Sequence, residues 1–268
     1  MALSLLNNVS SLEAQNELNQ TSASLQKVLV QLSSGSRLNS GADDPAGLSI
    51  ADSLHANEAE LSQAASNANT GIGLLQTADG SLGQITNLLD RAVTLATEAA
   101  NGGLSTSQLS ALDNEYQSIQ AEITRIGGQT TFNGSSVFTA STTSIFLGSA
   151  TNSIGVTIGT LSATTLALNT TSLTASTAAT ALDAINAAVE SVASSRGTLG
   201  ATLNRLTAAQ NVISNQVTNI TSAENLIRAA NIPEDVAEES QLSVLEQTGI
   251  SALTQANTQS QQILRLFQ

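Results

Sequence analysis

Apolar side chains recur at helical spacing near both ends of the chain. In residues 3–32 the leucines form two sets with a one-residue slip between them, namely Leu5 and Leu12, then Leu18, Leu25 and Leu32. In residues 236–267 one stripe carries Leu242, Leu245, Ala252, Ala256, Ile263 and Phe267. Steps of three, four and seven residues place side chains on one face of an α-helix. Each end is therefore expected to form an amphipathic helix with a narrow apolar seam.

Two longer stretches keep the same period, from Ala51 to Ala99 and from Leu182 to Ala230. The first begins at Asp44-Pro45, a strong helix start, because Asp caps an N-terminus and proline fits the first helical position. A helix from residue 45 to about residue 100 would be roughly 80 Å long. Such a length without internal caps indicates a coiled coil. A shorter helix is predicted around residues 112–126.

The segment 130–175 differs, because it is rich in Ser, Thr and Gly and alternates apolar and small residues around 145–147 and 154–158. This pattern predicts a β-hairpin with its loop at residues 148–153. The predicted fold is mainly α: a long antiparallel coiled-coil rod with a small β-hairpin insert near 135–176. Residues 1–44 and 230–268 are expected to pair as a discontinuous inner domain with its connector, and 45–229 to form the rod.

Composition narrows the classes of function. Only 8 Lys and Arg stand against 21 Asp and Glu, for a net charge of −13, and aromatic residues make up 2%. Binding to nucleic acid is not expected, because it needs clustered cations and stacking rings. The chain has no Cys and one His, His55. Neither a metal centre, a cofactor site nor a catalytic triad is expected. Paired Asp43 and Asp44 are interpreted as helix-start residues rather than catalytic carboxylates.

Neither a membrane-spanning run nor a cleavable signal with a basic start and an apolar centre is recognised. The terminal stripes pose a different problem. One pair of such thin seams buries too little area to offset an ordering entropy of about 1–2 kcal/mol per residue. The terminal helices are therefore expected to be disordered in a free monomer and to order when many copies associate, which predicts a polymer.

Several stretches, in order along nearly the whole chain, resemble bacterial flagellin. In the first half these are LSSGSRLNSGADDPAG (32–47), QAASNANTG (63–71), LDRAVTLATEAANG (89–102) and EITRIGGQTTFNG (122–134). In the second half they are SRGTLGATLNRL (195–206), NITSA (219–223) and GISALTQANTQSQQILRLF (249–267). The resemblance implies a structural subunit that polymerises into the filament used for swimming, with no enzymatic activity. It also implies a short form of the family without large outer domains.

Further expectations follow from the resemblance. The stripes with Leu5, Leu12, Leu18, Leu25, Leu32, Leu242, Leu245, Ile263 and Phe267 would form the assembly interface. The subunit would be extracellular, exported by the flagellar type III route without a cleaved signal. Its partners would be itself, the export apparatus, a flagellin export chaperone, and the cap and hook-junction proteins, with no nucleic acid or membrane. A hook–filament junction protein is the alternative function, followed by a filament-displayed adhesin or enzyme.

The family resemblance also singles out Arg91 and Leu95. They match a face that flagellins use for subunit contacts and that the host Toll-like receptor 5 reads. Asp90, Val93 and Thr94 depart from the strongly recognised pattern. The acidic residue that the family pattern places on the next helix is not cleanly in register in this sequence, where Glu115 is the nearest acid.

Overall fold

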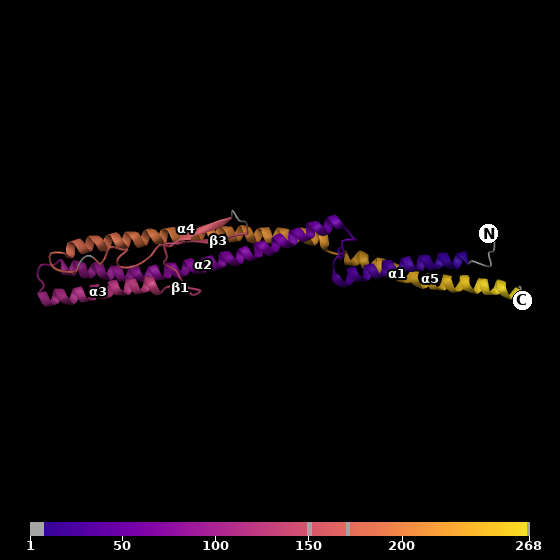
Figure 1. Cartoon of the computed structure of the whole chain (residues 1–268), viewed down its shortest axis with the longest axis horizontal. Coiled ribbons are helices and arrows are strands. Elements are labelled where there is room, and N and C mark those ends of the chain that lie inside the picture. Colours follow the sequence, from indigo (N-terminus) through magenta and orange to yellow (C-terminus); the bar gives the residue numbers. More distant parts are fainter. Residues whose placement is uncertain (1–7, 149–151, 170–171, 267–268) are drawn as a thin grey trace. The chain divides into compact units, whose positions relative to one another are not determined.

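The computed structural model describes residues 8–148, 152–169 and 172–266. Its helices are α1 (Val9–Ser34), α2 (Pro45–Ala99), α3 (Thr106–Gln129), α4 (Ala178–Arg228) and α5 (Ile232–Leu266). Its strands are β1 (Thr131–Phe132), β2 (Ser135–Ser136), β3 (Thr142–Phe146) and β4 (Ser153–Thr157). The prediction of a mainly α fold with a small β insert is confirmed (Figure 1).

The chain divides into two compact units. The terminal unit comprises residues 1–57 and 219–268, and the central unit comprises residues 58–218. Both divisions fall inside a helix, α2 and α4 respectively. The sequence-based domain boundaries, at 44/45 and 229/230, lie instead in the connectors between helices.

In the terminal unit α1 and α5 lie side by side (Figure 1). Asn8 Nδ2 donates to the Ala256 carbonyl at 3.1 Å, and Ser11 Oγ donates to Asn257 Oδ1 at 2.9 Å. The start of α1 thus meets the later part of α5, and the pair is antiparallel.

The central unit is built on a sustained heptad pattern. From residue 64 on, one row of buried positions along α2 alternates in steps of four and three: Ala64, Ala68, Gly71, Leu75, Ala78, Leu82, Ile85, Leu89, Ala92, Ala96 and Ala99. Leu95 is buried beside this row. This repeat of 3.5 residues per turn keeps one seam against a partner helix, and the alanines allow close approach. α4 lies antiparallel to α2, since Arg196 pairs with Asp79 at 2.8 Å and Gln210 donates to Asn69 at 2.8 Å.

α3 fastens an irregular segment, residues 161–173, onto the central unit. Tyr116, the only tyrosine and 0% exposed, donates its hydroxyl to the Leu168 carbonyl at 3.3 Å, and Gln120 donates to the same oxygen at 2.9 Å. The Leu173 amide donates to Asp113 at 2.7 Å. This segment buries Leu166, Leu168 and Leu173. Its described residues, 161–169 and 172–173, therefore extend the core and form no helix or strand.

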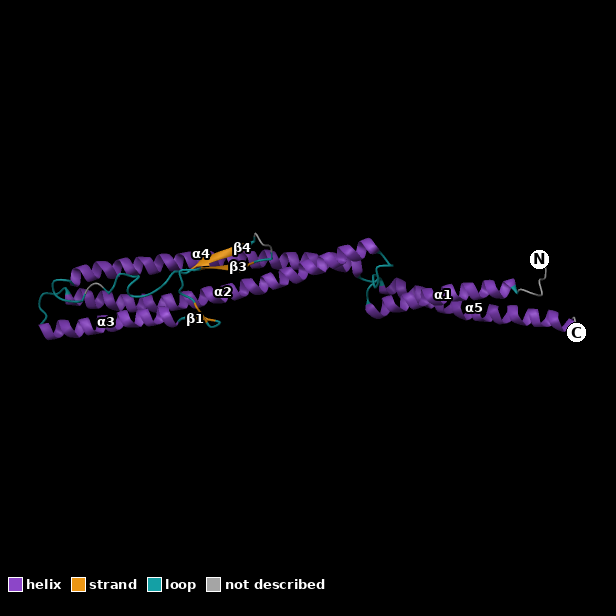
Figure 2. Ribbon diagram, viewed as in Figure 1, coloured by secondary structure: helices purple, strands orange, loops and turns teal. Residues whose placement is uncertain are grey.

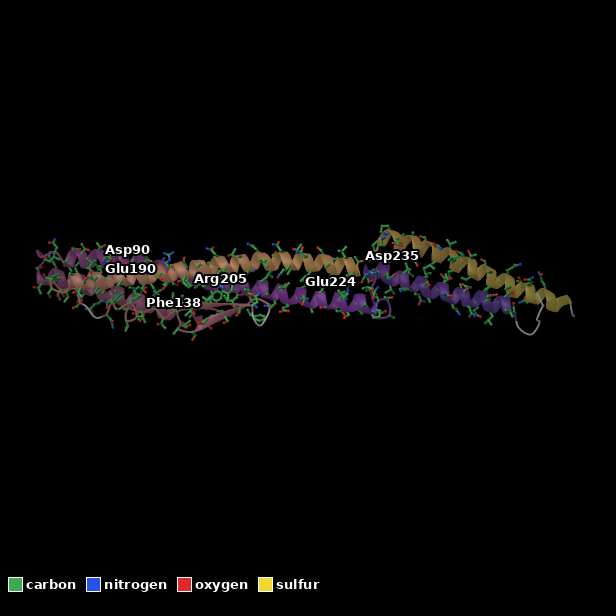
Figure 3. The ribbon with its side chains drawn as sticks, turned by 90° about the horizontal axis from the view of Figure 1, so that it is seen from above. Asp90, Phe138, Glu190, Arg205, Glu224 and Asp235 are labelled. Carbon is green, nitrogen blue, oxygen red and sulfur yellow. The ribbon has the colours of Figure 1, made fainter. Side chains whose placement is uncertain are left out.

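The strands form two separate antiparallel ribbons, β1–β2 and β3–β4 (Figure 2). Asn133 and Gly134 link β1 to β2 with φ of 50° and 77°. This pair suits a two-residue hairpin turn that needs positive φ at both positions. Beyond β2, Val137 and Phe138 turn into the core; Phe138, labelled in Figure 3, is 6% exposed.

Candidate assembly site

The α1–α5 seam follows a heptad pattern on both helices. On α1 the row consists of Ser11, Ala14, Leu18, Thr21, Leu25, Val28 and Leu32, all partly or fully buried. On α5 it consists of Asp235, Glu239, Leu242, Glu246, Gly249, Leu253 and Ala256. At one level of the seam, a Cβ added to Gly249 would lie 3.2 Å from Leu18 Cδ1. Each helix thus presents a narrow 3-4 row to the other.

The seam is poor in apolar side chains. Of the α1 residues only Val28 is fully buried. Three of the α5 positions are carboxylates, Asp235, Glu239 and Glu246, and Asp235 Oδ2 is a buried atom with no hydrogen-bond partner among the described residues. A buried polar atom without a partner costs about 1–3 kcal/mol. The terminal pair is therefore weakly held by its own seam.

Large apolar side chains instead lie on the outside of the same two helices. On α1 the exposed ones are Val9, Leu12, Leu29 and Val30, with Leu12 60% exposed. On α5 they are Ile232, Val236, Val244, Leu245 and Ile250, with Val244 65% exposed. These exposed apolar side chains are available for contacts with other molecules.

These outward residues point in several directions. At about 100° per residue, Leu12 and Val30 share a face nearly opposite the seam position Thr21, whereas Leu29 lies at the flank. On α5, Val244 lies nearly opposite the seam position Leu253. By the same rotation, Ile250 and Leu245 flank the seam on opposite sides. More than one neighbour is needed to cover all of them.

The leucine stripes predicted from the sequence are thus divided between two surfaces. Leu18, Leu25, Leu32 and Leu242 lie in the seam, whereas Leu12 and Leu245 are exposed. The one-residue slip between Leu12 and Leu18 accounts for the division on α1. Leu5 and Phe267 lie outside the described residues, and Ile263 belongs to α5 without a described side chain.

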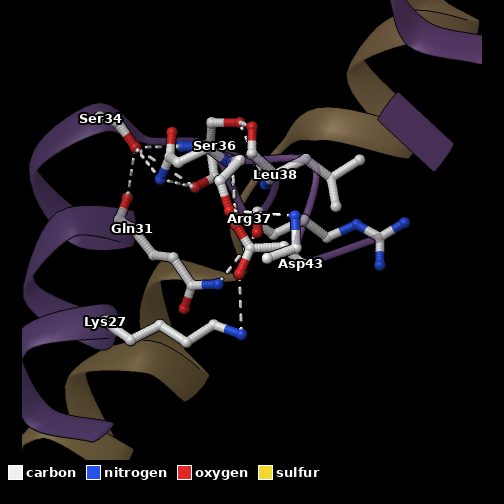
Figure 4. A network of polar contacts seen from close by, with 10 residues as sticks. Lys27, Gln31, Ser34, Ser36, Arg37, Leu38 and Asp43 are labelled. Atoms are coloured by element: carbon white, nitrogen blue, oxygen red, sulfur yellow. Dashed lines mark hydrogen bonds and ion pairs between the residues drawn. The ribbon is translucent and has the colours of Figure 1, made fainter. Parts of the chain in front are cut away.

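Main-chain hydrogen bonds join the two connectors of the terminal unit, and polar side chains of the α1–α2 connector extend this contact, here called the clasp, toward α1 (Figure 4). Ser36 and Ala229 form an antiparallel bridge, in which the Arg37 amide donates to the Arg228 carbonyl at 2.8 Å and the Ala230 amide donates to the Gly35 carbonyl at 3.0 Å. Arg37 Nε also donates to the Ile227 carbonyl at 2.6 Å. The α1–α2 and α4–α5 connectors are therefore held together by main-chain bonds.

Asp43 connects the clasp to α1 through Lys27. Its carboxylate accepts the amides of Asn39 and Ser40 at 3.2 and 3.0 Å and pairs with Lys27 Nζ at 2.9 Å. The Lys27 ammonium and these amides lower the pKa of Asp43 to about 2. This role of Asp43 was not predicted from the sequence. A signal was present, because Lys27 is the only lysine and lies on the helix just before the connector that carries Asp43.

The next residue starts α2. Asp44 Oδ1 accepts the Gly47 amide at 2.9 Å, and the helix begins at Pro45. Nearby, Glu224, 9% exposed, accepts Arg228 at 2.9 Å and lies 3.5 Å from His55 Nδ1, while Arg228 also reaches Asp52 at 3.3 Å. This ion-pair network joins the first turns of α2 to the last turns of α4.

Arg91 in the central unit forms a bidentate pair with Glu115 of α3. Its Nε and Nη2 donate to the two carboxylate oxygens at 2.7 and 3.1 Å, so Glu115, the nearest acidic residue by sequence, is the partner of Arg91 in this structure. Each partner stabilises the charged form of the other, which raises the pKa of Arg91 and lowers that of Glu115. Leu95, by contrast, is 0% exposed. It packs in the core, which does not fit the expectation that it shares a contact surface with Arg91.

Among the described residues, none of the helices combines the length and apolarity required to cross a membrane.

Known proteins resemble this chain through both of its halves. The model of the bacterial flagellin N-terminal helical region matches residues 5–143, and that of the C-terminal helical region matches residues 182–267.

Individual relatives agree with these matches. B-type flagellin of Pseudomonas aeruginosa is 44% identical over 151 residues, 56% of this chain and 31% of that protein. Flagellin 1 of Proteus mirabilis is 40% identical over 152 residues, 57% of this chain and 42% of that protein. The chain thus covers less than half the length of either relative.

A solved structure is also similar. The crystal structure of Bacillus cereus flagellin superposes with a TM-score of 0.51 at 32% identity, over 59% of this chain and 94% of that one. With both terminal helical regions matched, and the N-terminal match alone covering more than half of the residues, this chain belongs to the bacterial flagellin family.

Proposed function

We propose that this protein is a structural subunit that polymerises into a helical flagellar filament. The observation that carries the proposal is the set of exposed apolar side chains on α1 and α5, which point in several directions around a weak seam. A single two-fold dimer contact would cover one face of each helix. A helical array of head-to-tail contacts gives each subunit several neighbours and can cover the remaining faces.

The polar seam explains why ordering and assembly would be coupled. Asp235, Glu239 and Glu246 leave the α1–α5 pair little apolar burial of its own. Burial of side chains such as Val244 and Leu12 against neighbours would add about 1.5–3 kcal/mol each. The terminal helices would therefore become fully stable only in the polymer. The conformational entropy lost when they order would be offset by the apolar burial that accompanies association.

The charge of the subunit suits the same function. The net charge of −13 is spread over a chain in which only 11% of residues are charged. Repulsion between exposed charges is screened beyond about 8 Å at physiological salt. Acidic subunits would thus stay soluble before assembly and approach one another through amide and hydroxyl surfaces.

The remaining roles follow from membership of the family. The subunit would be extracellular, would leave the cell by the flagellar type III route without a cleaved signal, and would meet an export chaperone and the cap and hook-junction proteins. No enzymatic role is proposed. Arg91, held by Glu115 on the surface of α2 and α3, would serve a subunit contact and offer a contact point to Toll-like receptor 5.

The experiment that tests the proposal is seeded polymerisation followed by electron microscopy. The variant Val244→Gln/Ile250→Gln changes side chains that are 65% and 51% exposed, so its monomer should keep its helical circular dichroism. We expect it to need a higher protein concentration to form filaments. The matched control is Val212→Gln, 55% exposed on α4 of the central unit. Wild-type chain that forms no filaments from seeds, or a double variant that assembles like wild type, would contradict the proposal.

A further inference from the structure

The two β ribbons of the central unit leave strand edges available. Each sheet of the described residues has only two strands, so β1, β2, β3 and β4 are all edge strands (Figure 2). An edge strand presents main-chain amide and carbonyl groups that another strand can pair with. Where such an edge lies beside an apolar groove, it becomes a site of recognition.

The register shows which main-chain groups of β3 point outward. In an antiparallel ladder, opposed residues alternate between hydrogen-bonded and non-hydrogen-bonded pairs. The Leu147 amide donates to the Asn152 carbonyl at 2.9 Å, which makes that pair hydrogen-bonded. Three positions on, by alternation, the Ser144–Gly155 pair is not hydrogen-bonded. The amide and carbonyl of Ser144 therefore point away from β4.

Asn67 of α2 supports this assignment. Phe146 is also a non-hydrogen-bonded position by the same alternation, and its carbonyl accepts Asn67 Nδ2 at 3.1 Å. At Phe146 the outward edge of β3 is thus already bonded to α2, which leaves the outward main-chain groups of Ser144 for a further strand. The same reasoning applies to the other ribbon: Val137 donates to the Thr130 carbonyl at 3.0 Å, so the main chain of Ser136 points away from β1.

Both edges line one groove of about 520 Å³. Its floor is α2, with Leu74 and Gly71, and its apolar walls include Phe132, Val137 and Ile145. A Cβ added to Gly71 would lie 2.2 Å from Ile145 Cδ1, so β3 sits directly on the helix. None of the residues that line the groove is charged. It lies within the size range of ligand sites, about 300–1,000 Å³.

We propose that this groove binds an extended, uncharged polypeptide segment that adds a strand along β3 and places apolar side chains against α2. Strand addition needs two elements, outward main-chain groups on a strand and an apolar surface beside it. The main-chain hydrogen bonds supply affinity, and pockets for alternate side chains supply selectivity. The uncharged lining disfavours acidic or basic segments, because their charges would lose hydration without gaining a partner. The proposal goes beyond filament formation and does not depend on it.

The test uses the full-length monomer at low salt and follows backbone amide shifts of residues 131–146 by NMR. The probe is the capped peptide acetyl-Thr-Val-Thr-Val-Thr-amide, and the matched control is the same peptide with every amide N-methylated. The methylated peptide keeps the side chains but cannot donate main-chain hydrogen bonds. We expect shifts centred on Ser144 with the first peptide, and at least about tenfold weaker binding with the second.

A pair of variants tests the same edge from the protein side. Ser144→Pro removes the outward amide without removing a β3–β4 hydrogen bond, whereas Ser144→Ala keeps that amide. Binding should fall about tenfold in the first variant and stay unchanged in the second. Equal binding of the two peptides, or no shift with either, would overturn the proposal, and these outcomes need no variant to fold. Shifts in the groove with maltose but not with the peptide would also overturn it, in favour of a saccharide site.

Discussion

Gly127 of α3 is the position where the central unit tolerates a side chain least. A Cβ built there would lie 1.9 Å from the carbonyl oxygen of Leu161 and 2.8 Å from its carbonyl carbon. An ordinary carbon–oxygen contact is about 3.3 Å or longer. Gly127→Ala must therefore displace the main chain of the 161–173 segment by more than an ångström, because no flexible side chain can yield instead.

The next residue provides a matched control. Gly128 is also in α3, and a Cβ there would meet nothing within 4 Å. Both substitutions gain helix propensity, up to about 1 kcal/mol in a helix interior. Only Gly127→Ala adds overpacking, which costs about 1–3 kcal/mol. The difference between the two variants therefore isolates the clash and should be about 1–3 kcal/mol.

Thermal unfolding followed by the fluorescence of Tyr116 measures this difference. The chain has no Trp, so its only tyrosine reports on the central unit. For a unit of this size, about 1 kcal/mol shifts Tm by about 2–4 °C. We expect Gly127→Ala to melt about 2–12 °C below Gly128→Ala, with faster amide exchange in residues 161–173. Equal melting temperatures would refute the close packing of Leu161 on α3.

Three further predictions concern the polar contacts. Lowering the pH should protonate Asp43, whose pKa in the folded protein is lowered to about 2. The stability that its carboxylate contributes is therefore present above about pH 4 and is lost as the pH falls toward 2. Amide exchange of residues 36–43 should therefore accelerate in that window in wild type and already be fast at pH 7 in Asp43→Asn. Tyr116→Phe should lower the stability of the central unit by about 0.5–1.5 kcal/mol, measured by urea unfolding, with Gln120 still bonded to Leu168; no change would contradict that hydrogen bond. Arg91→Gln should change the free energy of unfolding little, because the ion pair with Glu115 is exposed. A double-mutant cycle with Glu115→Gln should show a small favourable coupling that weakens in high salt, and a coupling that does not depend on salt would contradict this account.

The regular helices could be predicted because their cores follow a period that the sequence displays. Leu75, Leu82 and Leu89 of α2 recur at seven-residue steps and are all buried. The segment 161–173 carries no such period, although Leu166, Leu168 and Leu173 are equally buried. Its position depends on Tyr116, Gln120 and Asp113 of α3, which are distant in sequence, so local patterns could not reveal it.

The assembly surface was predictable only in part. Apolar spacing identified the terminal helices but could not separate the residues that face the partner helix from those that face outward, since a slip of one residue rotates a side chain by about 100°. Leu12 and Leu18 were both assigned to the assembly interface, and they lie on different faces of α1. The Asn133-Gly134 turn, by contrast, was a readable hairpin signal that the sequence reasoning did not use.

The position of Lys27 has a practical consequence for imaging the protein. It is the only lysine, and it closes the connector clasp through Asp43. An amine-reactive dye can attach to only one side chain of this chain, and there it would remove the charge that Asp43 pairs with. Fluorescence labelling through lysine would thus report on a molecule with an opened connector. Because the sequence contains no Cys, a single cysteine introduced on an exposed position of α4 would give a uniquely labelled subunit with that contact intact.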